Sequence, residues 1–302
     1  MLETSQTKIA NGMLAVVTDL DAARTFVHSH ARLLDRRRFQ HAFDGAPAEL
    51  VIAALAAYRN PDGGFGALEP DLRTPASQPI PVRYAFDVLA TLPPSREAEA
   101  LARGALDWLV TVTNDDGGVP FVLPSAADEP AAPWMQPSPE SSLLATAQLA
   151  AGALRLQLDH PWLVGASDYC WGRIGDVSLG NAYELKYVVD FLDATPDQAR
   201  ADDEVDRLAG LVPSDGRIRV EGGADGEELD PLVLSPWPEH VGGRLLDPTV
   251  LDRGLDALEA GQQADGGWDF AWAKWNPAAT WEWRGAVTIE ALRTLLSYRR
   301  IK

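Results

Sequence analysis

The sequence contains a single cysteine, Cys170, among 302 residues. One thiol excludes an internal disulfide and any zinc site built from several cysteines. The chain also lacks an apolar run of about 18 or more residues, and its first 30 residues show no basic segment followed by an apolar core. We therefore expect neither a membrane-spanning helix nor a secretory signal, and we predict a soluble, cytoplasmic protein.

Basic residues are scarce. Lysine and arginine total 26, against 44 aspartates and glutamates, which gives a formal net charge of −18. Such a surface repels both nucleic acid and anionic lipid, so we expect no nucleic-acid partner. The hydrophobic fraction of 46% is ample for a sizeable core.

An Asp-Gly element recurs along the chain. It reads Asp62-Gly63-Gly64-Phe65, Asp116-Gly117-Gly118-Val119, a degraded Asp215-Gly216-Arg217, and Asp265-Gly266-Gly267-Trp268. The steps between the aspartates are 54, 99 and 50 residues, which is one period near 50 with a single copy missing. Helical apolar patterns flank the elements, so each unit is a predicted helical hairpin that reverses at its glycines.

A hairpin of this kind can bury its apolar face only against its neighbours. We therefore predict one domain over residues 17–302, after a flexible lead over 1–16. Helices are expected from about Asp19 and over residues 47–58, 81–92, 95–112, 138–156, 161–174, 181–192, 196–211, 250–258 and 285–296. Ser138-Pro139-Glu140 resembles a helix start, and Arg36-Arg37-Arg38 is interpreted as a solvated turn or a local salt-bridge donor. The stretch over 222–244 is either a lid or a decayed helix.

The last repeat has the form Gln-x-x-Asp-Gly-Gly-Trp. With this motif, residues from about 45 to 300 resemble the repeats of the prenyltransferase and squalene cyclase superfamily. The resemblance implies an all-α fold, an α/α toroid in which outer helices surround a barrel of inner helices. It also implies a bracing role for Gln263 and Trp268.

In such a toroid the N-termini of the inner helices meet at one end of the barrel, where polar and aromatic side chains would line a funnel. As acids we propose Asp71, Glu69 and Glu282. The expected substrate-binding residues are Arg73, Gln78, Tyr84, Trp134, Glu140, Tyr183, Glu184, Trp237, Trp275, Trp281 and Arg284. A desolvated aromatic wall stabilises a cation by up to about 2 kcal/mol, which suits carbocation chemistry on a hydrophobic ligand such as an isoprenoid, without a cofactor.

The sequence departs from two patterns of that superfamily. It has no Asp-x-Asp-Asp acid motif, the nearest match being Asp19-Leu20-Asp21. Asp168 and Cys170 followed by His240 only superficially resemble a zinc set, and we predict no metal. Two alternatives stay open: a non-catalytic binding or scaffold protein, and a carbohydrate-active α/α-barrel enzyme, since such enzymes also combine separated acids with tryptophan platforms. The loop around Asp71 could equally be a stiff, charge-paired connection.

Overall fold

The computed structural model describes residues 9–10, 13–14, 18–221, 223 and 225–302. Within these residues the chain is mostly α-helical, which confirms the all-α prediction. The predicted lead over 1–16 lies mostly outside the described residues, apart from the two-residue strands β1 (Ile9–Ala10) and β2 (Met13–Leu14).

Two series of helices alternate along the chain. The first helices of the hairpins are α1 (Leu20–His30), α3 (Ala48–Ala56), α5 (Arg96–Val112), α7 (Trp162–Arg173), α9 (Gln198–Ala209) and α10 (Pro248–Ala260). The second helices are α2 (Leu33–Asp44), α4 (Pro79–Ala90), α6 (Leu143–Arg155), α8 (Ala182–Ala194) and α11 (Pro277–Ser297). After α9, the short helices η3 (Pro231–Val233) and η4 (Val241–Leu245) stand in place of a second helix, and η4 packs against α8 and α9.

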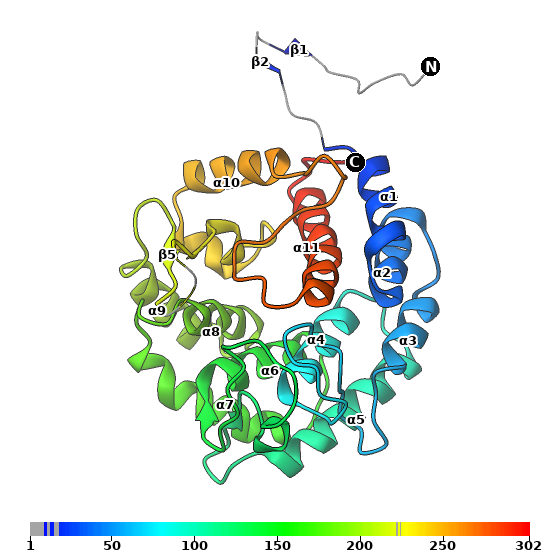
Figure 1. Cartoon of the computed structure of the whole chain (residues 1–302). Coiled ribbons are helices and arrows are strands. Elements are labelled where there is room, and N and C mark those ends of the chain that lie inside the picture. Colours follow the sequence, from blue (N-terminus) through cyan, green and yellow to red (C-terminus); the bar gives the residue numbers. More distant parts are fainter. Residues whose placement is uncertain (1–8, 11–12, 15–17, 222, 224) are drawn as a thin grey trace.

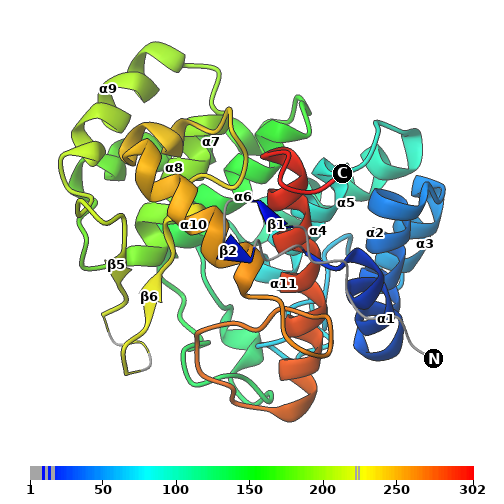
Figure 2. The same cartoon turned by 90° about the horizontal axis from the view of Figure 1, so that it is seen from above.

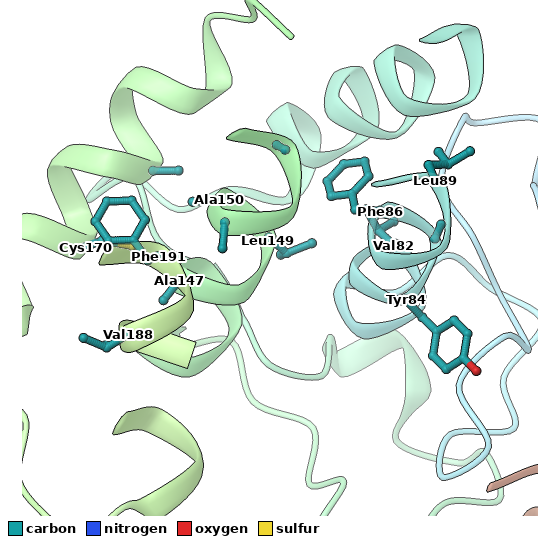
Figure 3. Close-up of a cluster of buried hydrophobic side chains, with 14 of the residues drawn as sticks. Val82, Tyr84, Phe86, Leu89, Ala147, Leu149, Ala150, Cys170, Val188 and Phe191 are labelled. Carbon is teal, nitrogen blue, oxygen red and sulfur yellow. The ribbon is translucent and has the colours of Figure 1, made fainter. Parts of the chain in front are cut away.

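The second helices pack on one another as well as on their own partners. Helix α6 lies between α4 and α8, and α11 packs against α2. Figure 1 shows the hairpins following one another around the molecule, so that α1 and α2 lie beside α11. Phe86 on α4, Leu149 on α6 and Phe191 on α8 belong to the main core, while Tyr84 points away from them on the other side of α4 (Figure 3).

Each glycine turn docks on the first helix of the next hairpin. Gly63 has φ of +97°, and a Cβ there would lie 2.4 Å from the carbonyl oxygen of Gly104 in α5. Gly117, with φ of +85°, meets the carbonyl of Gly165 in α7 in the same way, at 2.5 Å. The positive φ and the close approach both demand glycine, which is why the element recurs.

The last turn docks on the first helix. A Cβ at Gly266 would lie 2.2 Å from the carbonyl oxygen of Ala22 in α1. The Gln262 side chain accepts from the Asp19 amide and donates to the Asp19 carbonyl, each over 2.8 Å. Gln262 thus joins the two ends of the helical array, whereas the Gln263 side chain donates to the carbonyl of its neighbour Gly261.

Residues 19–44 therefore form a hairpin of their own, contrary to the expectation that the repeats begin near residue 45. Asp19 caps α1 as predicted, by accepting from the Ala22 amide. The solvated turn expected at Arg36-Arg37-Arg38 is wrong, because these residues lie inside α2, whereas the alternative of a local salt-bridge donor is confirmed for Arg38. Arg38 is buried and bonds to Asp35 and Glu290, so its charge is paired inside the protein.

Two helix starts also differ from expectation. Ser138-Pro139-Glu140 does not open α6, since Ser142 caps that helix and β4 (Ser141–Ser142) pairs with β3 (Val119–Pro120). Helix α11 begins at Pro277 rather than near 285, because Asn276 caps it through the Ala278 amide. Trp281, Trp283 and Arg284 are therefore helical residues and not part of a loop.

Candidate functional site

Asp71 lies in the loop before α4 and is only 3% exposed. Three tryptophan side chains donate to its carboxylate. The Nε1 atoms of Trp275 and Trp283 lie 2.8 and 2.9 Å from Oδ1, and Nε1 of Trp134 lies 3.3 Å from Oδ2. We call these four residues the indole cluster. Three donors are strong compensation for a carboxylate that has lost its water.

The backbone around Asp71 holds the neighbouring loop. The Ala132 amide donates to the Asp71 carbonyl over 2.8 Å, and the Arg73 amide donates to the Pro130 carbonyl over 2.9 Å. Figure 2 shows the loops that precede α6 and α11 at the same end of the molecule. The predicted convergence of Asp71, Trp134 and Trp275 is therefore present, although the indoles turn their N–H groups, and not their faces, toward the acid.

Glu69 is a second buried acid, 2% exposed and two residues from Asp71. Burial and, after it, the negative charge of Asp71 raise its pKa to about 8, although Arg83 and Arg32 oppose the shift. Burial also raises the pKa of Asp71, against the three indole donors. Near neutral pH Glu69 is thus a carboxylic acid that can donate a proton, and it lies two residues from a carboxyl group that accepts three indole hydrogen bonds.

Glu282, the third proposed acid, is engaged in ion pairs. Its carboxylate lies 3.0 Å from Nη1 of Arg73 and 3.9 Å from Nη1 of Arg32. Arg32 also donates to the hydroxyl of Tyr84 over 2.9 Å, and burial raises the pKa of that phenol. Glu282, Arg73 and Tyr84 therefore belong to one network of ion pairs and hydrogen bonds, in which the Glu282 carboxylate is paired with arginines.

Gln78 and Tyr183 fix segments around this site. Gln78 is fully buried and bonds to the Leu123 amide at 2.8 Å and to the Ser125 hydroxyl at 3.0 Å, which holds the chain beside η1 (Pro124–Ala126). Tyr183 donates to Glu227 over 2.9 Å, and burial raises its pKa. Glu227 lies just before β6 (Glu228–Leu229), which pairs with β5 (Ile218–Arg219). Sequence reasoning did not single out Glu227, and no local pattern marks it.

Three predicted residues lie elsewhere. Trp281 stacks on His30 of α1 with ring centroids 4.7 Å apart. Arg284 makes a bidentate pair with Asp265 at 2.7 and 2.8 Å. Trp237 contacts the guanidinium of Arg155 near the C-terminal end of α6. Trp283, which was not among the predicted site residues, takes the place beside Asp71, and the Asn276-Pro277 start signal would have put it on the helix.

Glu140 and Glu184 line a separate cavity of about 400 Å³. Its other lining residues are Phe121, Ser138, Ser141, Ser142, Leu143, Tyr169, Arg173 and Asp176. The cavity lies between the starts of α6 and α8, so these two acids do not share the site of Asp71.

The second helices also carry charged pairs. Arg83 and Asp87 of α4 are 2.8 Å apart, and Lys186 and Asp190 of α8 are 3.2 Å apart. The charges of these two pairs act on one another, since Lys186 lowers and Asp190 raises the pKa of Asp87. The surroundings of these helices are therefore more polar than the aromatic-lined cavity expected from the sequence.

Across the described part of the chain, no group of three or more His, Cys, Asp or Glu side chains is arranged to hold a metal ion. Cys170 is buried and burial raises the pKa of its thiol, while His240 is bonded to Asp190. None of the described helices combines the length and the apolar character needed to cross a membrane.

No protein-family model matches the chain, and no curated protein matches it.

Proposed function

We propose that this chain is an α/α toroid enzyme that protonates a hydrophobic small molecule, of the isoprenoid class, at the site of Glu69 and the indole cluster. The toroid is supported by the alternation of first and second helices, by the packing of α4, α6 and α8 in sequence, and by the docking of the last turn on α1. The single observation that carries the chemistry is the buried acid pair of Glu69 and Asp71 beside three tryptophans.

Glu69 is the proton donor in this proposal. Its pKa of about 8 keeps the carboxyl group protonated at neutral pH, and a general acid works best when its pKa is near the working pH. The proton passes to an alkene carbon or an epoxide oxygen, and the carboxylate left behind takes a proton back from the cationic intermediate. Asp71, kept anionic by its indole donors, stabilises the positive charge that develops.

Aromatic side chains beyond the indole cluster supply the binding surface. Trp272 packs edge-on against Trp283 with centroids 5.1 Å apart, and Phe270 lies 4.4 Å from Trp272. Trp134 has the longest bond to Asp71 and is 39% exposed. Since Glu69 and Asp71 are closed off, we propose that the substrate enters by displacing Trp134.

The test is product analysis by gas chromatography after incubation with prenyl diphosphates, linear polyprenes and a terminal polyprene epoxide, together with lipid extraction of the purified protein. We expect a cyclised or rearranged product from wild type and none from Glu69→Gln. Glu97→Gln, an exposed acid on α5, is the matched control and should keep full turnover. Turnover that survives Glu69→Gln would remove Glu69 as the donor. Neither product nor co-purified isoprenoid would favour the non-catalytic alternative.

A carbohydrate-active enzyme is a second candidate, favoured by the charged pairs on α4 and α8. Such side chains bind hydroxyl groups better than hydrocarbon. Release of reducing sugar from oligosaccharides, again lost in Glu69→Gln, would support this candidate over the first.

A further inference from the structure

The cavity between α6 and α8 is bordered by polar groups that have no partners. Tyr169 of α7 is only 6% exposed and lines the cavity, yet its hydroxyl makes no hydrogen bond with any described residue. The side chain of Glu184, in the first turn of α8, likewise has neither a hydrogen bond nor an ion pair within the described residues. The Tyr169 side chain is more than nine-tenths buried with its unpaired hydroxyl at the cavity, and the Glu184 carboxylate is partly withdrawn from water, so both groups point to a ligand that completes them.

The charge of the lining defines the ligand. Glu140, Glu184 and Asp176 supply three carboxylates, against the single guanidinium of Arg173. Arg173 is itself occupied, since it lies over the Tyr169 ring at 5.2 Å and 3.9 Å from Asp116 outside the lining. Burial raises the pKa of Glu184, as expected for an acid without a nearby cation.

We propose that this cavity binds a small organic cation that carries an ammonium group. The ammonium would donate to Glu184 and to the hydroxyl oxygen of Tyr169, with Glu140 and Asp176 adding attraction at the rim. Phe121 offers an apolar surface for the carbon skeleton of the ligand. A cavity of about 400 Å³ falls within the ordinary range for small-molecule sites. A neutral polyol would leave the excess negative charge unmatched, so the cation is the better complement.

The site is distinct from the site of Glu69 and the indole cluster, and it does not depend on the function proposed there. None of the lining residues is Glu69 or a member of the indole cluster. The two proposals can therefore fail separately, because Glu69→Gln should abolish turnover and leave cation binding unchanged.

The experiment is isothermal titration of the full chain with putrescine, with 1,4-butanediol as the neutral analogue and glucose as a polyol probe. We expect saturable binding of putrescine and at least tenfold weaker binding of the diol and of glucose. Glu184→Gln should weaken putrescine binding about tenfold and Tyr169→Phe about threefold, while Glu97→Gln and Glu69→Gln should leave it unchanged.

Other outcomes overturn the proposal. Equal affinity for putrescine and butanediol would show that charge is not recognised. Binding of glucose but not of putrescine would assign the cavity to a neutral polyol. Putrescine binding that is unchanged in Glu184→Gln would place the cation elsewhere on this acidic protein, and no heat with any probe, together with unchanged amide NMR signals around Tyr169, would leave no cation site.

Discussion

Nε1 of Trp275 lies 2.8 Å from Oδ1 of Asp71, although the two residues are 204 positions apart in the sequence. Trp283 donates to the same oxygen, so two tryptophans of the last hairpin bind a buried acid in the loop before α4. Asp71→Asn keeps the shape but places an amide NH₂ against one of the indole donors. We expect a loss of about 1–3 kcal/mol in the free energy of unfolding, measured by urea denaturation. A fully stable Asp71→Asn protein would show that the carboxylate charge is not needed for the fold.

The three indoles should contribute unequally. Trp283→Phe removes a short bond to a buried anion, and we expect a cost of about 1.5–3 kcal/mol. Trp134→Phe removes a 3.3 Å bond from a partly exposed ring and should cost less than about 1 kcal/mol. Each variant serves as the control for the other in urea denaturation. A larger loss of stability in Trp134→Phe than in Trp283→Phe would contradict the geometry of the indole cluster.

Glu69 makes stability depend on pH. Its pKa is about 8 in the folded chain against an ordinary value of 4.5, so the folded state holds a proton that the unfolded chain has already released. The stability that this proton confers is present below the unfolded pKa and is lost as the pH rises through about 8. Glu69→Gln carries no such proton, and we expect its melting temperature to fall less than that of wild type between about pH 5 and pH 9. Parallel curves for the two proteins would contradict the raised pKa.

The docking of the turns can be tested with glycine substitutions. Gly266→Ala would bring a Cβ against the backbone of Ala22 at a φ of +91°. Residues with a side chain rarely adopt this φ, and the clashing backbone atoms cannot rotate away as a side chain can. We expect a loss of more than about 2 kcal/mol, seen by thermal melting and denaturant titration. Gly172 lies in α7, and a Cβ there meets no atom within 4 Å, so Gly172→Ala should be neutral or stabilising by up to about 1 kcal/mol. Equal effects at the two positions would rule out close docking of the last turn.

Arg284 ties the last turn to α11 and α1. Its guanidinium binds both oxygens of Asp265 and covers the ring of Phe26 at 4.6 Å. We expect Arg284→Ala to cost about 1–3 kcal/mol, through lost packing and lost charge-assisted bonds. Arg103→Ala removes an exposed pair with Glu99 and an exposed bond to the Asp159 carbonyl, and it should cost less than about 1 kcal/mol in the same denaturation assay. Similar losses in the free energy of unfolding for both variants would mean that Arg284 stabilises the contact of the last turn with α11 and α1 no more than an exposed arginine does.

Local signals in the sequence accounted for much of the helical framework. Helices at α3, α5, α7, α8 and α9 follow the predicted segments closely, because apolar periodicity and caps such as Ser95 act within a few residues. The element α2 was missed because its three arginines look solvated when their partners are unknown. Arg36 and Arg37 bond to Ala31 and Gln40 nearby, but Arg38 is paired with Glu290 at the far end of the chain.

The same division applies to the site. Asp71, Trp134 and Trp275 could be named from the sequence as acid and aromatic candidates, and the recurring glycines marked the turns, since a positive φ is a local demand. Which indoles meet Asp71 could not be inferred, because Trp275 and Trp283 reach it only after the last turn docks on α1 and α11 packs against α2. Hydrogen bonds between residues about 200 positions apart depend on how the hairpins pack. The sequence of one hairpin does not determine which side chains of a distant hairpin will lie next to it.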